Sequence, residues 1–483
     1  MNWGVISRNV GIALICCAVF MFLSALVAAL DGFDSSFSPL LLSAILTLMV
    51  GIFPLIFVRR HKDINTREGL AILLIAWFFS CVFSMIPYVL WGGEFSLVNA
   101  WFESTSGITT TGATVLQDIE ALPKGLLFWR SSTHYIGGLG VVVFIMMILP
   151  SFGTVRFKMS KIDVDDISKN NYQYKSNKFI RVVVSVYLGI TVCSLLSLLL
   201  AGMPFFDAVN HAMSVSATGG FSIKNASIAA YQSPAVEIIL IIFMIVASLH
   251  FGLIYASFAT RSFKVLKNTI TKFYLTTILV MGVLVAANLV WSGTISNVWE
   301  ALRHSFFTVV STISTTGFGS TDTNIWPVFS ILILLYAGIQ CGCSGSTTSG
   351  LRSDRVYLTL KAAWAQVIKM AYPTAVVQVK SDGQAVDREL LSSVSLYVLL
   401  YLILTLVMAI VYAAFGLDLL TSVSASVSMM SNVGPCFGTF GSSMSSFAAA
   451  PEAVKVLMGF QMIVGRLGIY SILLVFVLYR KRG

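Results

Sequence analysis

Long apolar stretches alternate with short polar segments along most of this chain. Many of the apolar stretches approach or exceed about 18 residues, the length at which a helix can cross a bilayer. We expect membrane-spanning helices at residues 10–30, 38–58, 69–91, 125–150, 179–202, 234–259, 270–291, 326–362 (interrupted), 390–415 and 453–479. The pattern therefore predicts an all-α polytopic membrane protein with ten transmembrane helices.

The first two expected spans stand apart, and the other eight form four pairs, each separated by a polar stretch. An amphipathic segment in each stretch predicts a short helix, at residues 98–109, 205–216, 300–313 and 420–431. Each short helix runs into a polar turn that ends in glycine, namely Thr109-Thr110-Thr111-Gly112, Ser216-Ala217-Thr218-Gly219, Ser314-Thr315-Thr316-Gly317 and Ser431-Asn432-Val433-Gly434. One such turn is ordinary, because Ser, Thr and Gly dominate turns. Four copies, with glycines 107, 98 and 117 residues apart, predict four copies of one unit around one pore.

This repetition divides the chain into an N-terminal two-helix segment and four pore repeats. The expected boundaries are 1–62 for the segment and 63–155, 156–262, 263–380 and 381–483 for the repeats. Each repeat consists of a helix, a short pore helix, a turn and a second helix. Because each repeat crosses the membrane twice, successive copies keep one orientation, unlike the inverted repeats of many secondary transporters.

Composition supports the membrane assignment and excludes a soluble globular protein. The chain is 57% hydrophobic and only 11% charged, with a mean hydropathy of +0.86. Polar groups must cover most of the outside of a soluble protein, and this chain has too few of them. The net charge of +10 is explained by basic residues in the expected inner segments of a membrane protein, so we expect no nucleic-acid partner.

The location of the charges predicts the orientation. With residue 1 in the cytoplasm, 25 of the 31 basic residues fall in inner segments, as the positive-inside rule requires. Both termini are then cytoplasmic. Twelve of the 21 acidic residues fall outside or at the outer mouths, where they would attract cations; membrane topology alone is the alternative reason for this pattern.

The turns have the residue types of a filter built from backbone carbonyls. A potassium ion must exchange its water shell for oxygens, and glycine permits the positive φ that such a backbone needs. No carboxylate occurs in the four turns, which argues against a divalent-cation filter. The candidate potassium ligands are Thr110, Thr111, Gly112, Ala217, Thr218, Gly219, Thr315, Thr316, Gly317, Asn432, Val433 and Gly434.

Two features lie below this expected filter. Residues 342–350 contain three glycines and five hydroxyl residues, which should interrupt the eighth span. Arg466 lies in the middle of the last span, where an unpaired cation costs at least about 2.5 kcal/mol. We expect Arg466 to face the broken segment and to repel passing cations. A structural kink and a packing arginine are the alternatives.

The chain resembles the TrkH branch of the Trk/Ktr/HKT family of potassium transporters. The resemblance lies in Phe102 to Thr114, Ala217 to Ser222, Thr315 to Phe318 and Asn432 to Pro435, with Gly137 to Gly140 and Gly465 to Leu467. It implies a fourfold pseudosymmetric potassium pore in a bacterial inner membrane, paired into a homodimer. It also implies that an intramembrane loop gates the pore. The implied gating residues are Gly342, Gly345, Ser346, Thr347, Thr348, Gly350 and Arg466.

The resemblance further implies a cytoplasmic nucleotide-binding, TrkA-like partner. Segments 151–181 and 351–389 are too short for a domain of usual size, so we expect no organic cofactor on this chain. Their basic residues fit either partner docking or contact with anionic lipid. No histidine has the spacing of a hydrolase motif, so we expect no enzyme. Potassium symport coupled to H⁺ or Na⁺, and transport of another solute or monovalent cation, stay open.

Overall fold

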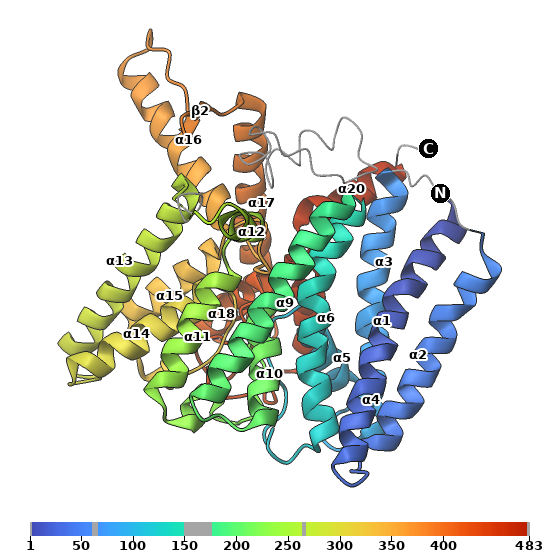
Figure 1. The fold of residues 1–483 in the computed structure, drawn as a ribbon. Coiled ribbons are helices and arrows are strands. Elements are labelled where there is room, and N and C mark those ends of the chain that lie inside the picture. The colour runs from blue at the N-terminus through green and yellow to red at the C-terminus, as the bar shows by residue number, and fades with distance from the viewer. Residues whose placement is uncertain (1, 60–65, 149–175, 263–266, 481–483) are drawn as a thin grey trace.

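The computed structural model describes residues 2–59, 66–148, 176–262 and 267–480, and it is helical apart from one small hairpin (Figure 1). In chain order the elements are α1 (Trp3–Leu30), α2 (Phe37–Phe57), α3 (Thr66–Ser84), α4 (Ile86–Trp91), α5 (Leu97–Ile108), α6 (Lys124–Ile148), α9 (Ser176–Leu200), α10 (Phe205–Ser216), η2 (Ser227–Tyr231), α11 (Pro234–Ala247), α12 (Phe251–Ala259), α13 (Thr269–Trp291), α14 (Val298–Ile313), η4 (Thr323–Ile325), α15 (Val328–Gln340), α16 (Ser353–Ala371), β1 (Lys380–Ser381), β2 (Gln384–Ala385), α17 (Arg388–Ala414), α18 (Leu419–Ser431), α19 (Glu452–Leu467) and α20 (Ile469–Arg480). The expected all-α class is confirmed.

Every expected span contains helix, but several are not continuous. Within the described ranges, six helical stretches are long and apolar enough to cross a membrane, or seven if α11 and α12 count as one bent span. The total of ten spans therefore stays a prediction. The boundaries at 62/63 and 155/156 lie outside the described residues, 262/263 lies at their edge, and 380/381 falls within β1.

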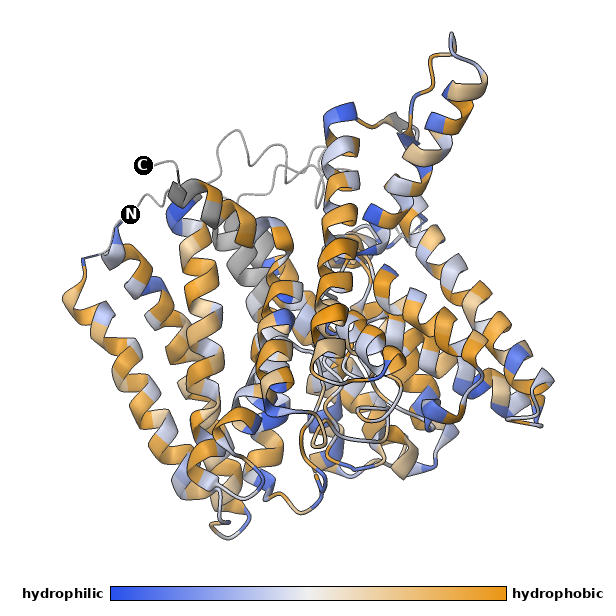
Figure 2. Ribbon diagram, turned by 180° about the vertical axis from the view of Figure 1, so that it is seen from behind, coloured by the Kyte–Doolittle hydropathy of each residue, from blue (hydrophilic) through white to orange (hydrophobic). Residues whose placement is uncertain are grey.

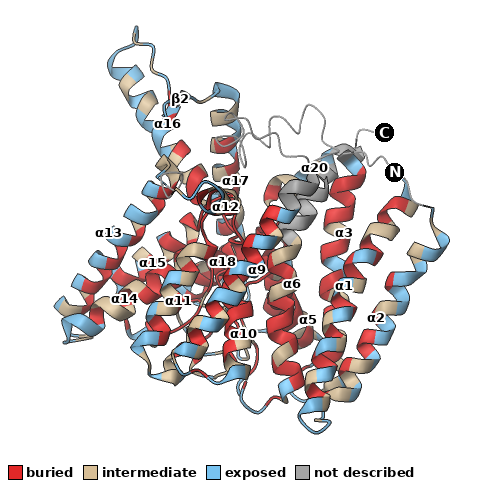
Figure 3. Cartoon of the chain, viewed as in Figure 1, coloured by how far each residue is buried: buried red, intermediate tan, exposed pale blue. Residues whose placement is uncertain are grey.

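Many large apolar side chains are exposed and many hydroxyl side chains are buried, the reverse of the pattern in a soluble protein. Large apolar side chains such as Leu200 and Trp291 are 90% and 93% exposed. Figure 2 shows these hydrophobic colours along the long helices, and Figure 3 shows the buried residues gathered between them. Hydroxyl side chains such as Thr111, Ser216 and Thr316 are fully buried. This distribution suits a protein surrounded by lipid with a polar centre.

The four expected short helices are confirmed as α5, α10, α14 and α18, each followed by its glycine turn. Side-chain caps begin three of them: Ser96 accepts a hydrogen bond from Asn99 N, Asn297 from Trp299 N and Asp418 from Thr421 N. Such caps satisfy backbone donors at a helix start and so fix where it begins. The negative C-terminal ends of all four helices therefore lead into the turns.

Two spans expected to be continuous are broken, so the sequence prediction was wrong for 234–259 and 453–479. The helices α11 and α12 meet at an angle of 97°. The break is stable because Ser248 O accepts from Cys343 N and Phe251 N donates to Gly345 O, both at 3.0 Å, so the interrupted eighth span satisfies the freed backbone groups. The last span breaks at Gly468, whose φ of +80° favours glycine.

The N-terminal pair α1 and α2 lies at one edge of the molecule (Figure 1). The two helices approach closely at Gly11 and Gly51: a Cβ on Gly11 would overlap Gly51 O, and a Cβ on Gly51 would lie 3.0 Å from Gly11 O. Small residues that allow backbones to touch are a common basis of helix packing in membranes.

We expect Gly11→Val to lower the free energy of unfolding by about 1–3 kcal/mol, the scale of overpacking a tight contact. Thermal unfolding of the purified protein in detergent measures this loss. The matched control is Gly189→Val, since a Cβ there meets nothing within 4 Å. Equal stability of the two variants would contradict the packing argument.

Candidate functional site

Four short backbone segments, the ring segments, follow the pore helices at residues 109–112, 217–220, 314–317 and 431–434. Their second residues all have left-handed backbones, with φ of 54° at Thr110, 51° at Thr218, 56° at Thr315 and 56° at Asn432. Their fourth residues are glycines with φ of 80°, 86°, 79° and 102°. Left-handed conformations at non-glycine residues are strained and cluster at functional sites. One backbone shape is thus repeated four times.

A backbone hydrogen bond fixes the same register in every segment. The amide of the third residue donates to a serine carbonyl five residues earlier, at 2.8 Å from Thr111 to Ser106, 2.9 Å from Gly219 to Ser214, 2.9 Å from Thr316 to Ser311 and 3.0 Å from Val433 to Ser428. These bonds anchor each segment to the last turn of its own pore helix. The four segments are therefore equivalent residue by residue.

The four ring segments contact one another in a closed circle, which we call the ring. A Cβ built on Gly112 would overlap Gly219 O, one on Gly220 would overlap Thr316 O, one on Gly317 would overlap Val433 O, and one on Gly434 would overlap Thr111 O. Each glycine thus packs against the carbonyl of the next segment, and the fourth returns to the first. Only a residue without a side chain permits this approach. The ring brings together four backbone carbonyls from four repeats.

The sequence alignment of the second segment was wrong by one residue. Gly220, not Gly219, is equivalent to Gly112, Gly317 and Gly434, and Ala217 takes the place of Thr109. Gly219 is small for another reason, because a Cβ there would overlap the His134 ring. The serine six residues before each ring glycine would have given the correct register.

Side chains also join the ring segments. Asn432 Nδ2 donates to Thr111 Oγ1 at 2.9 Å, which connects the fourth segment to the first. The same Nδ2 donates to Met462 O on α19 at 2.9 Å. The remaining predicted ligands Thr110, Ala217, Thr218, Thr315, Thr316 and Val433 are all at most 4% exposed. All twelve residues predicted from the sequence therefore lie in one ring or next to it.

A cavity of about 110 Å³ lies where the chain leaves the ring segments, lined by all four ring glycines and by loops of the first, second and fourth repeats. Its rim carries both signs of charge, because Lys224 Nζ lies 3.0 Å from Glu120 Oε2. Asn225 donates a hydrogen bond to Asp118, and this bond lowers the pKa of the exposed Asp118 carboxyl. Asp118 is therefore ionised at neutral pH beside the cavity.

On the other side of the ring, the expected interruption is a buried loop between α15 and α16. Gly342, Gly345, Ser346, Thr347, Thr348 and Gly350 all belong to it. Thr347 Oγ1 lies 3.2 Å from both Ser216 O and Ala247 O, and Ser349 N lies 3.5 Å from Thr315 Oγ1. The loop therefore touches the second and third repeats directly beneath the ring.

The loop glycines allow close packing. Gly345 has a φ of +76°, and a Cβ there would lie 2.6 Å from His250 Nε2. A Cβ on Gly350 would overlap Cys341 Sγ, and one on Gly342 would lie 2.7 Å from Thr348 Cγ2. Hydroxyl groups form further hydrogen bonds within the loop, with Ser346 Oγ 2.7 Å from Thr348 Oγ1. A folded, hydrogen-bonded loop thus replaces the missing turns of helix.

Arg466 contacts this loop, as the sequence predicted. Its Nη1 donates to Thr347 O at 2.8 Å and to Ser349 Oγ at 2.5 Å, and its Nη2 donates to Gly137 O at 3.2 Å. The side chain belongs to α19 and is 4% exposed. A buried guanidinium is stable only when acceptors surround it. Arg466 therefore connects the loop to α6 of the first repeat and α19 of the fourth.

The comparisons with known proteins agree with this geometry. The sequence model of the TrkH family, described as a cation transport protein, matches residues 41–481. The chain is 29% identical over 482 residues to the Trk system potassium uptake protein TrkH of Salmonella typhimurium, which covers 99% of each chain. It is 32% identical over 420 residues to the Trk system potassium uptake protein TrkG of Escherichia coli, covering 86% of this chain and 85% of that protein. The crystal structure of the potassium transporter TrkH from Vibrio parahaemolyticus superposes with a TM-score of 0.88 at 27% identity, over 98% of both chains. The chain therefore belongs to the TrkH family of cation transport proteins.

Proposed function

We propose that this chain is the potassium-conducting subunit of a bacterial potassium uptake system and that the ring is its selectivity filter. The observation that carries the proposal is the closed contact of four ring segments, which brings four backbone carbonyls together. Carbonyl oxygens can replace the hydration shell of a monovalent cation. The ring segments contain no carboxylate, and the relatives compared above are named potassium uptake proteins.

The direct test is the flux of Rb⁺ into proteoliposomes that contain the purified chain. We expect that excess external K⁺ blocks this Rb⁺ uptake and that the same concentration of Na⁺ does not. Uptake that Na⁺ blocks equally well would contradict potassium selectivity. An absence of Rb⁺ uptake from vesicles with proven insertion would contradict the conduction proposal itself.

The loop between α15 and α16, together with Arg466, is proposed as the gate. The loop lies beneath the ring, and the Arg466 charge would repel a cation that leaves it. Two hydrogen bonds from Arg466 hold the loop in place, and a third reaches Gly137 O on α6. An open state would require these bonds to break, because they tie the loop to α6 and α19.

Thr347→Val is expected to raise K⁺ flux about tenfold, the effect of losing hydrogen bonds worth about 1.4 kcal/mol in total. Valine keeps the shape of threonine but cannot donate to Ser216 O or Ala247 O. Thallium flux in proteoliposomes measures the change. Thr277→Val is the matched control, since that hydroxyl bonds only within its own helix, to Phe273 O. Parent flux in Thr347→Val would remove this residue from the gate.

Regulation is proposed to come from a second protein. The compared relatives are named as parts of a Trk system, so we propose a nucleotide-binding, TrkA-like partner and a homodimer in the inner membrane. The helix α16 and the β1–β2 hairpin project from the end of the molecule where both termini lie (Figure 1). With the termini in the cytoplasm, α16 would transmit partner binding to the loop that precedes it.

A further inference from the structure

A buried ion pair lies behind the first ring segment. Arg130 Nε on α6 lies 2.9 Å from Glu103 Oε1 on the pore helix α5. The two side chains are 1% and 0% exposed. A charge removed from water in this way is stable only with a partner and further hydrogen bonds.

Glu103 holds the chain that leaves the first ring segment. Its Oε1 and Oε2 accept from Thr114 Oγ1 at 3.0 and 3.1 Å, and Oε2 also accepts from Val115 N at 3.0 Å. These two residues lie two and three places after Gly112. A pore-helix carboxylate therefore fixes the outer end of the first ring segment.

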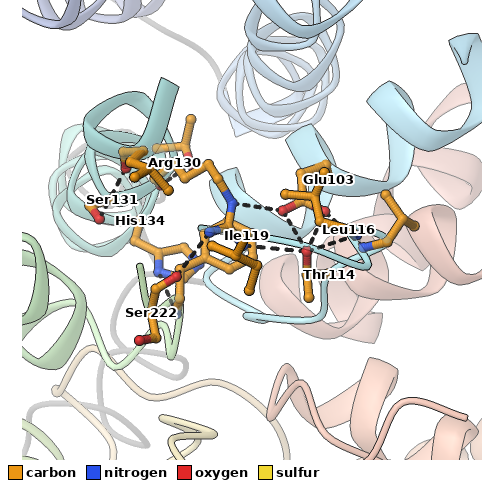
Figure 4. A network of polar contacts seen from close by, with 12 residues as sticks. Glu103, Thr114, Leu116, Ile119, Arg130, Ser131, His134 and Ser222 are labelled. Carbon is orange, nitrogen blue, oxygen red and sulfur yellow. Dashed lines mark hydrogen bonds and ion pairs between the residues drawn. The ribbon is translucent and has the colours of Figure 1, made fainter. Parts of the chain in front are cut away.

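Arg130 extends this contact to the second repeat. Its Nη1 donates to Ser222 O at 2.9 Å, two residues after Gly220. Its guanidinium carbon lies 4.2 Å from the centre of the Phe221 ring, and Nη2 lies 3.4 Å from Thr114 Oγ1. Figure 4 shows Arg130 joined by these bonds to Glu103 and Thr114 on one side and to Ser222 on the other. One planar side chain thus spans two ring segments.

The other segments are tied to their own pore helices by neutral groups. His211 Nε2 lies 3.0 Å from Ser222 Oγ, His304 Nδ1 lies 3.0 Å from Ser320 Oγ, and Ser424 Oγ donates to Phe437 O at 2.8 Å. Among these four contacts between a ring segment and its pore helix, the pore-helix side chain is charged only in the first repeat. The junction of the first and second segments is therefore held differently from the rest.

We propose that Arg130 is a positioning residue for ion selectivity, which holds the first and second ring segments at the separation that the permeating cation requires. Glu103 orients the guanidinium and neutralises its charge, so that the outer mouth does not repel cations. This inference rests on the proposed function of the ring. The forked, planar shape of arginine is essential, because a lysine cannot bond to Glu103 and Ser222 while stacking on Phe221.

The test is the reversal potential of the purified chain in planar bilayers, with K⁺ on one side and Na⁺ on the other. Arg130→Lys is expected to lower the K⁺/Na⁺ permeability ratio about tenfold, the scale of one lost charge-assisted hydrogen bond. Arg8→Lys is the matched control, because the Arg8 guanidinium donates to Leu55 O and Val58 O within the N-terminal pair α1 and α2. Its permeability ratio is expected to equal that of the parent.

A reversal potential reports only molecules that conduct, so a loss of folded protein does not imitate the expected change. Thr114→Val, a milder change that removes the hydroxyl shared by Glu103 and Arg130, is expected to shift the ratio in the same direction. A K⁺/Na⁺ permeability ratio in Arg130→Lys equal to that of the parent overturns the inference. If Arg130→Lys does not insert, an unchanged ratio in Thr114→Val overturns it instead. A parent protein that does not prefer K⁺ would instead overturn the proposed function.

Discussion

Gly317→Ser is expected to lower the K⁺/Na⁺ permeability ratio about tenfold or more. A Cβ at this position would overlap Val433 O and would lie 2.9 Å from Pro435 Cδ, on a backbone with φ of +79°. The fourth ring segment must therefore move away, and steric displacement of this kind costs about 1–3 kcal/mol. Because 1.4 kcal/mol corresponds to about a factor of ten, even a partial change in how the ring distinguishes two cations is measurable by reversal potential.

The matched control is Gly293→Ser. Gly293 also has a positive φ, of 71°, but a Cβ there meets nothing within 4 Å. The two variants therefore share the backbone strain and differ in whether the side chain enters the ring. A parent-like ratio in both variants would mean that the carbonyl contacts of Gly317 do not set selectivity.

Arg466→Ala is expected to raise K⁺ flux on the order of a hundredfold, since two charge-assisted hydrogen bonds of about 1.5 kcal/mol each are lost from the closed loop. The K⁺/Na⁺ ratio should not change, because the ring keeps all its contacts. Stopped-flow thallium flux measures the first quantity, and reversal potential measures the second.

Arg466→Lys separates the two effects attributed to this residue. Lysine keeps the positive charge but cannot bond to Thr347 O, Ser349 Oγ and Gly137 O together. If repulsion of the cation dominates, flux in the lysine variant stays near that of the parent. If the hydrogen bonds dominate, flux rises as in the alanine variant. Parent flux in Arg466→Ala would exclude Arg466 from the gate.

Much of the candidate site was predictable, because its signals are chemical and repeat along the chain. Polar turns at corresponding places between spans predicted the ring, and a lone charge in an apolar span predicted the contact of Arg466 with residues 342–350. An unpaired guanidinium in a membrane must find acceptors, and the glycine- and hydroxyl-rich segment offered the densest set. The structure confirms that contact.

The missed features depend on contacts that one sequence does not reveal. Adjacent glycines at 219 and 220 left the register of the second segment ambiguous, and the spacing from Ser214 gains its meaning only from the hydrogen bond between Gly219 N and Ser214 O. The break between α11 and α12 lies in an apolar stretch that would form a continuous helix alone. It is stabilised by backbone hydrogen bonds to Cys343 and Gly345, about a hundred residues away.

The second helix of the N-terminal pair and the four short helices were predicted with boundaries close to those observed, because their signals are local, whereas α1 begins at Trp3 and not at residue 10. The expected helix at 98–109, for example, is Leu97–Ile108. The role of Arg130 was not predictable in this way. Its partner Glu103 lies 27 residues earlier, and without a fold this arginine resembles any charge at the outer end of a span.

The most direct test of the account is to locate Rb⁺ by anomalous diffraction from crystals of the protein grown in RbCl. We predict an anomalous peak on the axis of the ring, surrounded by the carbonyl oxygens of Thr111, Gly219, Thr316 and Val433. A preparation that takes up Rb⁺ in a K⁺-sensitive manner, yet shows Rb⁺ only outside the ring, would contradict the account.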